Sequence, residues 1–214
     1  KAEGQKYFDA VEAEFARVLA EDVGAGLQLI PQTEFDRIAA CFARPAAVQP
    51  AAELAAPTDA PLPYQRWLQR NVHAHQVPGY RAVTLSLKRA GLPPGDITGD
   101  QMDTAAALAT RYSCGELRVS HDQNLVLPWV RQADLPALFE AARAAGFATP
   151  NIGLVTDMIN CPGGDFCALA NARSIPVAAA ITERFADLDE VYDIGDIDLH
   201  ISGCINSCGH HHSG

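Results

Sequence analysis

The residues of this chain whose types and spacing best support chemistry are four cysteines towards its C-terminal end. They form two pairs, with five residues between Cys161 and Cys167 and three between Cys204 and Cys208. Glycines and a proline lie within or beside the pairs, and glycine lets a backbone curl around an inorganic group with its N–H groups pointing inward. Four thiolates in two close pairs suit either a tetrahedral zinc ion or an iron–sulfur cluster.

The spacing favours the cluster but leaves alternatives open. Structural zinc sites usually place about two to four residues between paired cysteines, so a gap of five fits a larger cubane better. Reduced core cysteines are a third interpretation, and Cys41 and Cys114 are expected to be buried residues of that kind. A disulfide framework is disfavoured, because nothing marks the chain as secreted and it holds only 6 cysteines in 214 residues.

Two segments resemble the sirohaem-dependent sulfite and nitrite reductase family. The C-x5-C and C-x3-C pairs, separated by 36 residues, are similar to the cluster signature of that family. Residues 201–209 (ISGCINSCG) resemble its TGCPNGCG segment, with Ile205 in place of Pro and Ser207 in place of Gly. Residues 115–125 (GELRVSHDQNL) resemble the G-x-x-R-x-T-x-x-Q-N strand pair of its ferredoxin-like half-domain. The resemblance runs from about residue 79 to residue 214, with both motifs in the expected order.

The resemblance implies two cofactors. Cys161, Cys167, Cys204 and Cys208 would hold a 4Fe–4S cluster. Cys208 would also bridge to the iron of a sirohaem as its axial ligand. A thiolate shared by both centres would couple an electron store to the site of reduction, and hydrogen bonds to sulfur would tune the potential.

Four further residues would contact the sirohaem if the resemblance holds. Asn206 would lie beside the macrocycle and bind one of its carboxylates. Arg118, Gln123 and Asn124 would face the sirohaem from the half-domain. The roles of the consecutive histidines 210–212 stay open between metal ligands, a proton relay and part of a tag. The histidines at 73, 75, 121 and 200 have no spacing that suggests a site.

The implied reaction is the six-electron reduction of sulfite to sulfide or of nitrite to ammonia, with a ferredoxin or a flavoprotein as electron donor. In this family the basic groups that bind the anion lie mainly before the second half-domain, so no catalytic residue is assigned in this chain. We therefore expect a fragment that is inactive alone, from a protein of the reducing cytoplasm. Two rival classes are a zinc-stapled structural or interaction module and an iron–sulfur electron carrier without sirohaem. The segment 118–124 argues against both rival classes, because neither a zinc module nor a simple electron carrier requires it.

The elements that must position these residues can be read from the hydrophobic pattern. In the middle of the chain the expected elements are a half-buried strand at 83–87, a helix at 98–112, strands at 116–120 and 125–130, and a helix at 134–146. Further along, the expected elements are a strand at 152–156, a helical stretch at 167–185 broken or kinked at Pro176, a solvated acidic stretch at 187–198, and a strand at 197–202.

Before these lie two predicted helices. One spans about residues 6–23 with Phe8 and Phe15 on its apolar face, and the other is capped by Thr33 with Phe35 and Phe42 inward. The predicted class is α+β: a sheet with helices on one face, then part of an α/β iron–sulfur/sirohaem domain, all preceded by a helical segment. The expected regions are helical residues 1–45, an Ala/Pro-rich linker at 46–63, the half-domain at 64–150, and the truncated cofactor domain at 151–214.

Composition and charge exclude several classes of protein. The chain has 26 acidic and 16 basic residues and a formal charge of −10, so it lacks the electrostatic footprint of a nucleic-acid binder. No apolar stretch approaches the roughly 20 residues that cross a bilayer, and no membrane association is expected. An anionic substrate such as sulfite or nitrite would have to be collected by local basic groups against this net charge.

Overall fold

The computed structural model describes residues 2–21, 30–55 and 57–212. Its internal contacts divide the chain into two units, residues 1–45 and residues 46–214. In the described part of the chain, no helix is long and apolar enough to cross a membrane.

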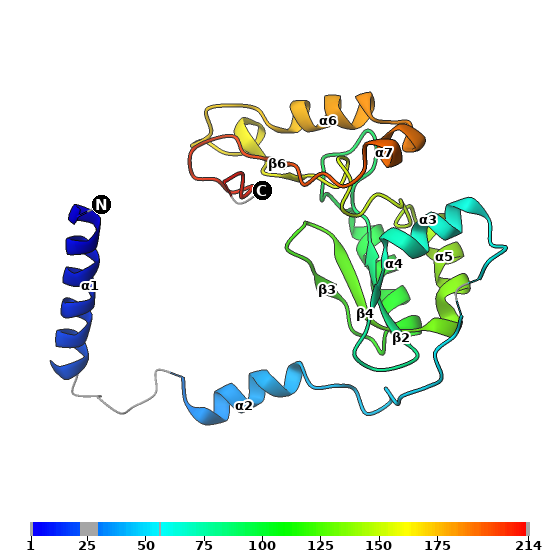
Figure 1. Cartoon of the computed structure of the whole chain (residues 1–214), viewed down its shortest axis with the longest axis horizontal. Helices are drawn as coiled ribbons and strands as arrows, with labels where there is room; N and C mark the ends of the chain where they lie inside the picture. The colour runs from blue at the N-terminus through cyan, green and yellow to red at the C-terminus, as the bar shows by residue number, and fades with distance from the viewer. Residues whose placement is uncertain (1, 22–29, 56, 213–214) are drawn as a thin grey trace. The chain divides into compact units, whose positions relative to one another are not determined.

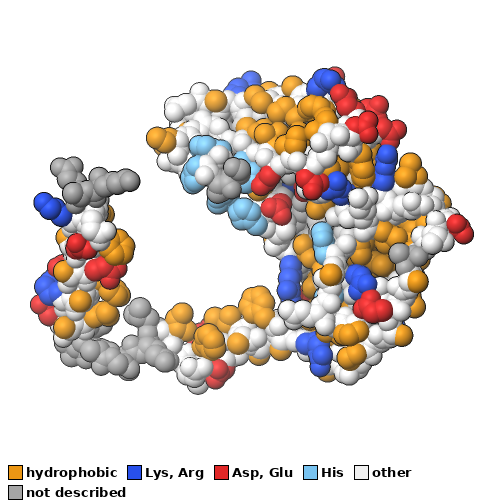
Figure 2. All heavy atoms as spheres, viewed as in Figure 1, with side chains coloured by type: hydrophobic (Ala, Val, Ile, Leu, Met, Phe, Trp, Pro, Cys, Tyr) orange, Lys and Arg blue, Asp and Glu red, His pale blue; other side chains and the backbone are white. Residues whose placement is uncertain are grey.

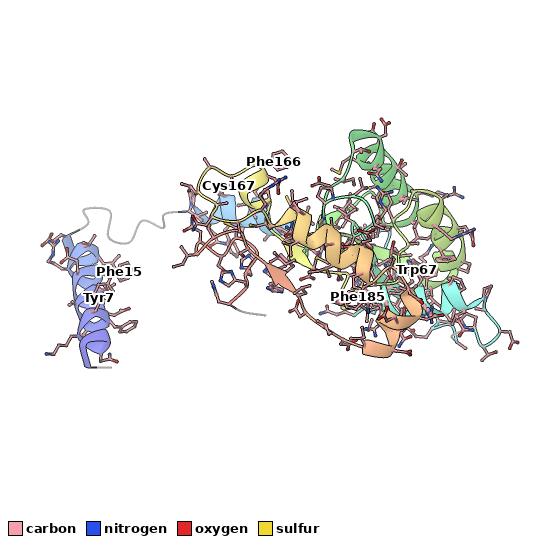
Figure 3. All side chains as sticks on the ribbon, turned by 90° about the horizontal axis from the view of Figure 1, so that it is seen from above. Tyr7, Phe15, Trp67, Phe166, Cys167 and Phe185 are labelled. Carbon is pink, nitrogen blue, oxygen red and sulfur yellow. The ribbon has the colours of Figure 1, made fainter. Side chains whose placement is uncertain are left out.

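The N-terminal unit consists of two helices, α1 (Ala2–Glu21) and α2 (Gln32–Cys41). Both helices were predicted, but their apolar residues are exposed rather than inward: Phe15 is 60% and Phe42 67% exposed. Figures 2 and 3 show apolar side chains at the surface of α1. The residue before α2 is Pro31, without a side-chain cap, so the predicted cap at Thr33 is wrong. The prediction that Cys41 is a buried core residue is also wrong, because the structure exposes it at the end of α2.

The segment after residue 45, predicted to be a linker, contributes to the core of the second unit. Val48 is fully buried in a cluster with Val77, Tyr80 and Trp129. The Ala51 N–H donates to the carbonyl oxygen of Pro78 at 3.0 Å. These contacts attach the start of the segment to the sheet, whereas the predicted domain boundaries themselves stay a prediction.

The sheet of the second unit is antiparallel and has four strands. In spatial order these are β1 (Val72–Ala74), β2 (Tyr80–Leu85), β4 (Leu125–Arg131) and β3 (Arg118–Val119). Helices α3 (Leu62–Arg70), α4 (Gly99–Tyr112) and α5 (Leu135–Ala144) gather on one side of it, with a one-turn helix at Gln132–Asp134 before α5 (Figure 1). The predicted α+β class is confirmed, whereas β1, α3 and the one-turn helix before α5 were not predicted.

Local sequence signals explain these boundaries. The Thr98 side chain accepts the N–H of Gln101, whose own side chain accepts the N–H of Thr98, a capping box that starts α4. Gly146 ends the α5 region with a φ of +78°, a left-handed conformation that favours glycine. The main core lies between sheet and helices, where Trp67 is fully buried and contacts the Phe139 ring at a centroid distance of 5.3 Å.

The prediction that the strand at 83–87 is half-buried is wrong, because both of its faces are covered. Thr84, Ser86 and Lys88, expected to face solvent, are 7%, 0% and 4% exposed. The segment that follows α5 lies over this second face, and the Ser86 hydroxyl donates to Asn151 Oδ1 at 2.8 Å. The apolar residues of this alternating pattern therefore lie in the main core, and the polar residues are buried on the other face, beneath the segment that follows α5.

The C-terminal region is built around two short parallel strands, β5 (Ile159–Asn160) and β6 (His200–Ile201). Its helices are a one-turn helix at Gly163–Asp165, α6 (Ile175–Arg184) and α7 (Leu188–Ile194). The predicted strand at 152–156 is wrong, since Leu154 forms only an isolated bridge with Asp196. Residues 167–174 are not helical, and Pro176 lies in the first turn of α6. There the missing N–H of proline breaks no helical hydrogen bond.

Candidate metal and cofactor site

The two cysteine pairs lie on neighbouring loops that follow β5 and β6. Because these strands are parallel, both loops leave the same end of the two-stranded sheet. The Cys161 N–H donates to the Ile201 carbonyl oxygen at 3.0 Å, which continues the pairing past β5. The N–H groups of Asn171 and Ala172 then both donate to the Gly203 carbonyl oxygen, at 2.9 and 3.0 Å. The chain therefore holds the segments carrying Cys161–Cys167 and Cys204–Cys208 side by side.

Two glycines make this close approach possible. A Cβ at Gly203 would lie 2.7 Å from the Gly163 Cα and 2.8 Å from the Ala172 carbonyl oxygen. Gly163 has a φ of +56°, and a Cβ there would lie 2.8 Å from the same carbonyl oxygen. Real Cβ atoms do not approach other atoms so closely, so the loops meet at this distance only because both positions are glycine.

Cys161 has the environment of a thiolate ligand. It is 7% exposed, and its Sγ accepts the Gly203 N–H at 3.1 Å. The Ser174 hydroxyl donates to the carbonyl oxygen of the same cysteine. Hydrogen bonds to sulfur and burial are the means by which proteins tune iron–sulfur centres. The donor type, the loop arrangement and this N–H bond fit an iron–sulfur cluster.

The other three cysteines are more accessible. Cys167 and Cys208 are exposed, Cys204 is half-buried, and none of the six cysteines is in a disulfide. Figure 3 shows Cys167 and Phe166 together at the tip of their loop. Among the described residues, no three Cys, His, Asp or Glu side chains converge closely enough to hold a metal ion. The loops therefore place the four thiols in one region without gathering them around one point.

Of the residues expected to contact sirohaem, Arg118 and Asn206 lie at the surface. The Arg118 guanidinium pairs with the Glu116 carboxylate at 2.6 Å, with 42% of its side chain exposed, and lies 6.0 Å from the Trp129 ring centroid. Asn206 is exposed on the loop between Cys204 and Cys208. Both side chains are accessible to a ligand.

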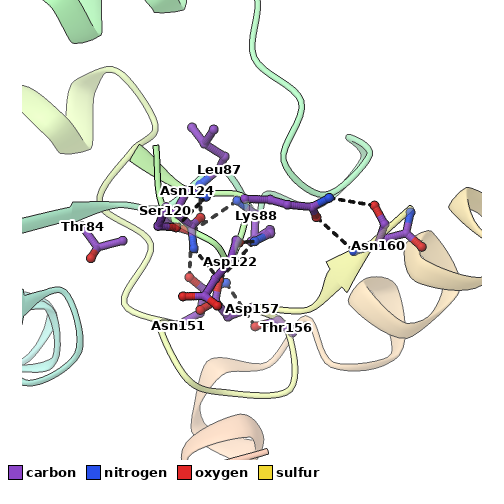
Figure 4. Close-up of polar contacts among 12 residues, drawn as sticks. Thr84, Leu87, Lys88, Ser120, Asp122, Asn124, Asn151, Thr156, Asp157 and Asn160 are labelled. Carbon is purple, nitrogen blue, oxygen red and sulfur yellow. Dashed lines mark hydrogen bonds and ion pairs between the residues drawn. The ribbon is translucent and has the colours of Figure 1, made fainter. Parts of the chain in front are cut away.

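Gln123 and Asn124 instead bind the segment that leads into the first cysteine loop, at Asn160 and Asp157. Figure 4 shows Asn124 beside Asp157. Gln123 Nε2 donates to the Asn160 carbonyl oxygen, and the Asn160 N–H donates to Gln123 Oε1, both at 3.0 Å. Asn124 is 1% exposed; its Oδ1 accepts the Leu87 N–H at 3.0 Å and its Nδ2 donates to Asp157 Oδ1 at 2.9 Å. The sequence motif thus marked two residues that join the half-domain to the cysteine-bearing region.

Sequence reasoning missed the charged pair at the centre of this junction. Lys88 Nζ lies 3.3 Å from Asp157 Oδ1, and the two side chains are 1% and 7% exposed. Burial lowers the pKa of Lys88 and raises the pKa of Asp157, and their mutual attraction opposes both shifts. Lys88 Nζ also donates to the Asp122 carbonyl oxygen. The only sequence signal was a lysine that continues the alternation of a strand, which is equally typical of a solvent-exposed position.

The remaining candidate residues are the histidines and Cys114. The rings of His121 and His210, which no sequence spacing connected, lie with centroids 4.8 Å apart. His200 Nε2 lies 2.8 Å from an Asp198 carboxylate oxygen. The prediction that Cys114 is a buried core residue is wrong: it is exposed, in a left-handed conformation with a φ of +53°, just after α4.

Comparison with known proteins identifies the half-domain. The family model described as "Nitrite/Sulfite reductase ferredoxin-like half domain" matches residues 75–145. A chloroplastic ferredoxin–nitrite reductase of Betula pendula is 32% identical over 161 residues, covering 73% of this chain and 26% of that protein. A sulfite reductase (ferredoxin) 2 of Mycolicibacterium paratuberculosis is 26% identical over 136 residues, covering 61% of this chain and 24% of that protein.

A solved structure agrees in fold. The Mycobacterium tuberculosis NirA protein matches with a TM-score of 0.50 and 24% identity, over 75% of this chain and 27% of that chain. The antiparallel sheet with helices on one side, joined to paired cysteine loops, defines an α+β half-domain linked to a thiolate-bearing region. Residues 75–145 belong to the nitrite/sulfite reductase ferredoxin-like half-domain family, and the chain is similar to the nitrite and sulfite reductases named above. It spans about a quarter of the length of the curated relatives it matches.

Proposed function

We propose that this chain is part of a reductase that converts nitrite to ammonia or sulfite to sulfide, using a 4Fe–4S cluster coupled to sirohaem. The observation that carries the proposal is the pair of cysteine loops, held side by side beyond β5 and β6 and joined to a nitrite/sulfite reductase half-domain. The relatives named above are ferredoxin–nitrite and ferredoxin-dependent sulfite reductases, which favours a ferredoxin over a flavoprotein as electron donor.

In this proposal Cys161, Cys167, Cys204 and Cys208 would hold the cluster, and Cys208 would also hold the sirohaem iron. Cys161 is already buried and accepts a backbone N–H, whereas the three remaining thiols are accessible enough to move onto a cluster. When bound, the cluster and the sirohaem would supply the one-electron chemistry that reduces the anion. The chain's own contribution is to hold the two cysteine loops side by side and to bury Cys161 beside a backbone N–H donor.

The surroundings of the cysteines support the presence of a large cofactor. Three large apolar side chains beside them are strongly exposed: Phe166 at 81%, Leu169 at 72% and Ile205 at 91%. Exposed apolar groups clustered around ligand residues are typical of a binding surface. We assign Arg118 and Asn206 as the contacts to sirohaem carboxylates, because both are accessible.

Substrate binding needs positive charge that this chain does not concentrate. Its formal charge is −10, and acidic residues outnumber basic residues by 26 to 16. A small anion such as nitrite is attracted into a site only where basic side chains offset such a field. We therefore assign no catalytic residue here and infer that the anion-binding groups lie in other parts of the complete enzyme. The regions 1–45, 46–63, 64–150 and 151–214, and a reducing cytoplasmic location, belong to the same proposal.

The experiment is an anaerobic visible spectrum, with iron and acid-labile sulfide assays, on the full-length gene product that contains this sequence. We expect sirohaem bands together with about four iron and four sulfide from the cluster. Cys161→Ser and Cys204→Ser should remove cluster iron, while Cys41→Ser and Cys114→Ser are matched controls that keep it.

Two outcomes would overturn the proposal. A colourless protein with about one zinc per chain would instead identify a zinc-stapled structural module. Cluster iron without sirohaem bands would identify a simple electron carrier.

A further inference from the structure

We propose that Gln123 is a positioning residue for Cys161, acting as a one-residue substitute for a third strand beside β5. What Cys161 ligates rests on the proposed function, but the positioning itself is a property of this chain without any metal. The inference assigns Gln123 a role different from direct contact with sirohaem.

The hydrogen bonds around β5 alternate between its two edges. The N–H groups of Ile159 and Cys161 donate towards β6, to the carbonyl oxygens of Leu199 and Ile201 at 2.9 and 3.0 Å. The N–H and C=O of Asn160, between them, therefore point to the opposite edge. That edge has no neighbouring strand among the described residues.

Gln123 satisfies both of these backbone groups. Its amide accepts the Asn160 N–H and donates to the Asn160 carbonyl oxygen, each at 3.0 Å. This pair of bonds is the one that a residue in a neighbouring strand would provide. Asn160 is 4% exposed, so unpaired backbone groups there would be shielded from water and costly.

The Gln123 side chain is itself held in place. It lies in the turn between β3 and β4 with a φ of +55°, a left-handed conformation. Gly95 packs against it, since a Cβ at that position would lie 3.0 Å from the Gln123 Cβ. The turn is closed by the Ser120 N–H, which donates to the Asn124 carbonyl oxygen at 2.8 Å. These contacts fix the backbone and the Cβ of Gln123, so its amide reaches β5 from a well-defined position.

The next residue anchors the same segment a few positions earlier. Asn124 Nδ2 donates to Asp157 Oδ1 at 2.9 Å, and the Gly153 N–H donates to Asp157 Oδ2 at 3.1 Å. Consecutive residues of one turn thus hold positions 157 and 160. The chain that enters Cys161 is fixed by both, which explains why Cys161 alone among the four candidate ligands is buried.

The test is the alkylation rate of each cysteine in the reduced, metal-free 214-residue chain, measured with iodoacetamide and peptide mass spectrometry. Gln123→Asn keeps a side-chain amide but shortens its reach by one methylene, and asparagine adopts the left-handed φ of this position more readily than glutamine does. We expect this variant to alkylate at Cys161 about tenfold faster, the effect of losing two buried hydrogen bonds. Cys167 and Cys208, already exposed, should keep their rates.

Matched variants separate positioning from general destabilisation. Gln132→Asn shortens a glutamine whose Oε1 accepts the Leu54 N–H, and it should leave Cys161 protected. Gln123→Glu keeps the length and the acceptor but loses the donor, so its Cys161 rate should be intermediate. If Gln123→Asn does not fold, the Gln123→Glu rate decides. An unchanged Cys161 rate in the folded variants would overturn the proposal.

The holoenzyme gives an independent readout. In the full-length protein, Gln123→Asn should shift the cluster reduction potential while Gln132→Asn leaves it unchanged. If the full-length protein holds no cluster iron but Gln123→Asn still speeds the alkylation of Cys161, the proposed function is refuted and the positioning role stands. If the protein holds cluster iron but the alkylation rate is unchanged, the positioning role is refuted and the proposed function stands.

Discussion

At the residue scale, the buried pair of Lys88 and Asp157 is the most consequential feature outside the cysteines. The two charges lie 3.3 Å apart with almost no exposure. Asp157 is stabilised by Lys88 and by the Asn124 amide, and Lys88 by Asp157 and the Asp122 carbonyl oxygen. Removing one partner from such a pair costs more than the pair contributes, because a lone charge is left buried. The junction between half-domain and cysteine loops is therefore sensitive to the protonation of one carboxyl.

The pH dependence of stability should report this carboxyl. Burial raises the pKa of Asp157 above its ordinary 3.8, so the folded state binds the proton more tightly than the unfolded state. The stabilisation from this group is fully present below pH 3.8 and is lost as pH rises through the raised value. Wild type should thus gain stability relative to Asp157→Asn as pH falls from 7 towards 4, by about 1.4 kcal/mol per unit of pKa elevation.

Urea unfolding of both chains across this pH range measures the difference. Asp103→Asn, which changes an exposed carboxyl on α4, is the matched control and should show no such trend relative to wild type. A stability difference between wild type and Asp157→Asn that stays constant with pH would contradict the raised pKa of Asp157.

The candidate residues were found from the sequence, but their partners were not. Spacing singled out Cys161 and the resemblance singled out Gln123 and Asn124, because short motifs are visible along the chain. The contacts of Gln123 and Asn124 are with residues 37 and 33 positions away. No local pattern encodes such a pairing, so the positioning of the cysteine loop emerged only from the fold.

At the element scale, α4 was predicted closely because its start carries its own signal. The Thr98–Gln101 capping box satisfies N–H groups that the first turn leaves unpaired. By contrast, the sequence predicted a helical stretch from residue 167 that Pro176 would break or kink, whereas α6 starts only at Ile175 and has Pro176 in its first turn. The β2 strand was predicted to be half-buried, because alternation does not distinguish a solvent-facing residue from one that pairs inside a second core layer.

Thr98→Ala should lower the free energy of unfolding by about 1 kcal/mol, because the side-chain cap of α4 is lost. The midpoint of thermal unfolding should fall by about 2–4 °C for a chain of this length. Thr110→Ala is the control: it removes an exposed hydroxyl that donates to the Ala106 carbonyl oxygen within the same helix. Alanine has the higher helix propensity there, so no loss is expected. Equal effects of the two substitutions would contradict the capping role.

At the scale of the whole molecule, α7 and the residues just after it are held against α3 by the Tyr192 side chain and two ion pairs. The Arg66 guanidinium lies 4.4 Å from the Tyr192 ring centroid, and the Tyr192 hydroxyl donates to the Pro150 carbonyl oxygen at 2.9 Å. Arg66 and Arg70 pair with Asp189 and Asp196, each at 2.5 Å. The acidic stretch, predicted as a solvated loop and helix end, therefore also attaches the C-terminal region to the half-domain.

The N-terminal unit should contribute little to this stability. None of its described side chains, in residues 4–21 and 30–44, is buried. Short helices without tertiary packing are marginal in water. A chain that begins at Ala46 should therefore keep the thermal midpoint of the full chain within about 2 °C by near-ultraviolet circular dichroism. Its loss of exposed apolar side chains should also reduce aggregation. A fall in the midpoint of about 5 °C or more would show that these helices stabilise residues 46–214.

The network of Ser86, Lys88 and Asn124 with Asn151 and Asp157 has a consequence for modular exchange. The match to the half-domain model ends at residue 145, yet these three side chains find their partners beyond residue 150. A half-domain grafted between relatives at the end of the similarity would carry a buried lysine without its carboxylate. The segment that must be exchanged as one piece is therefore longer than the matched residues 75–145, and chimaeras should be joined after residue 160.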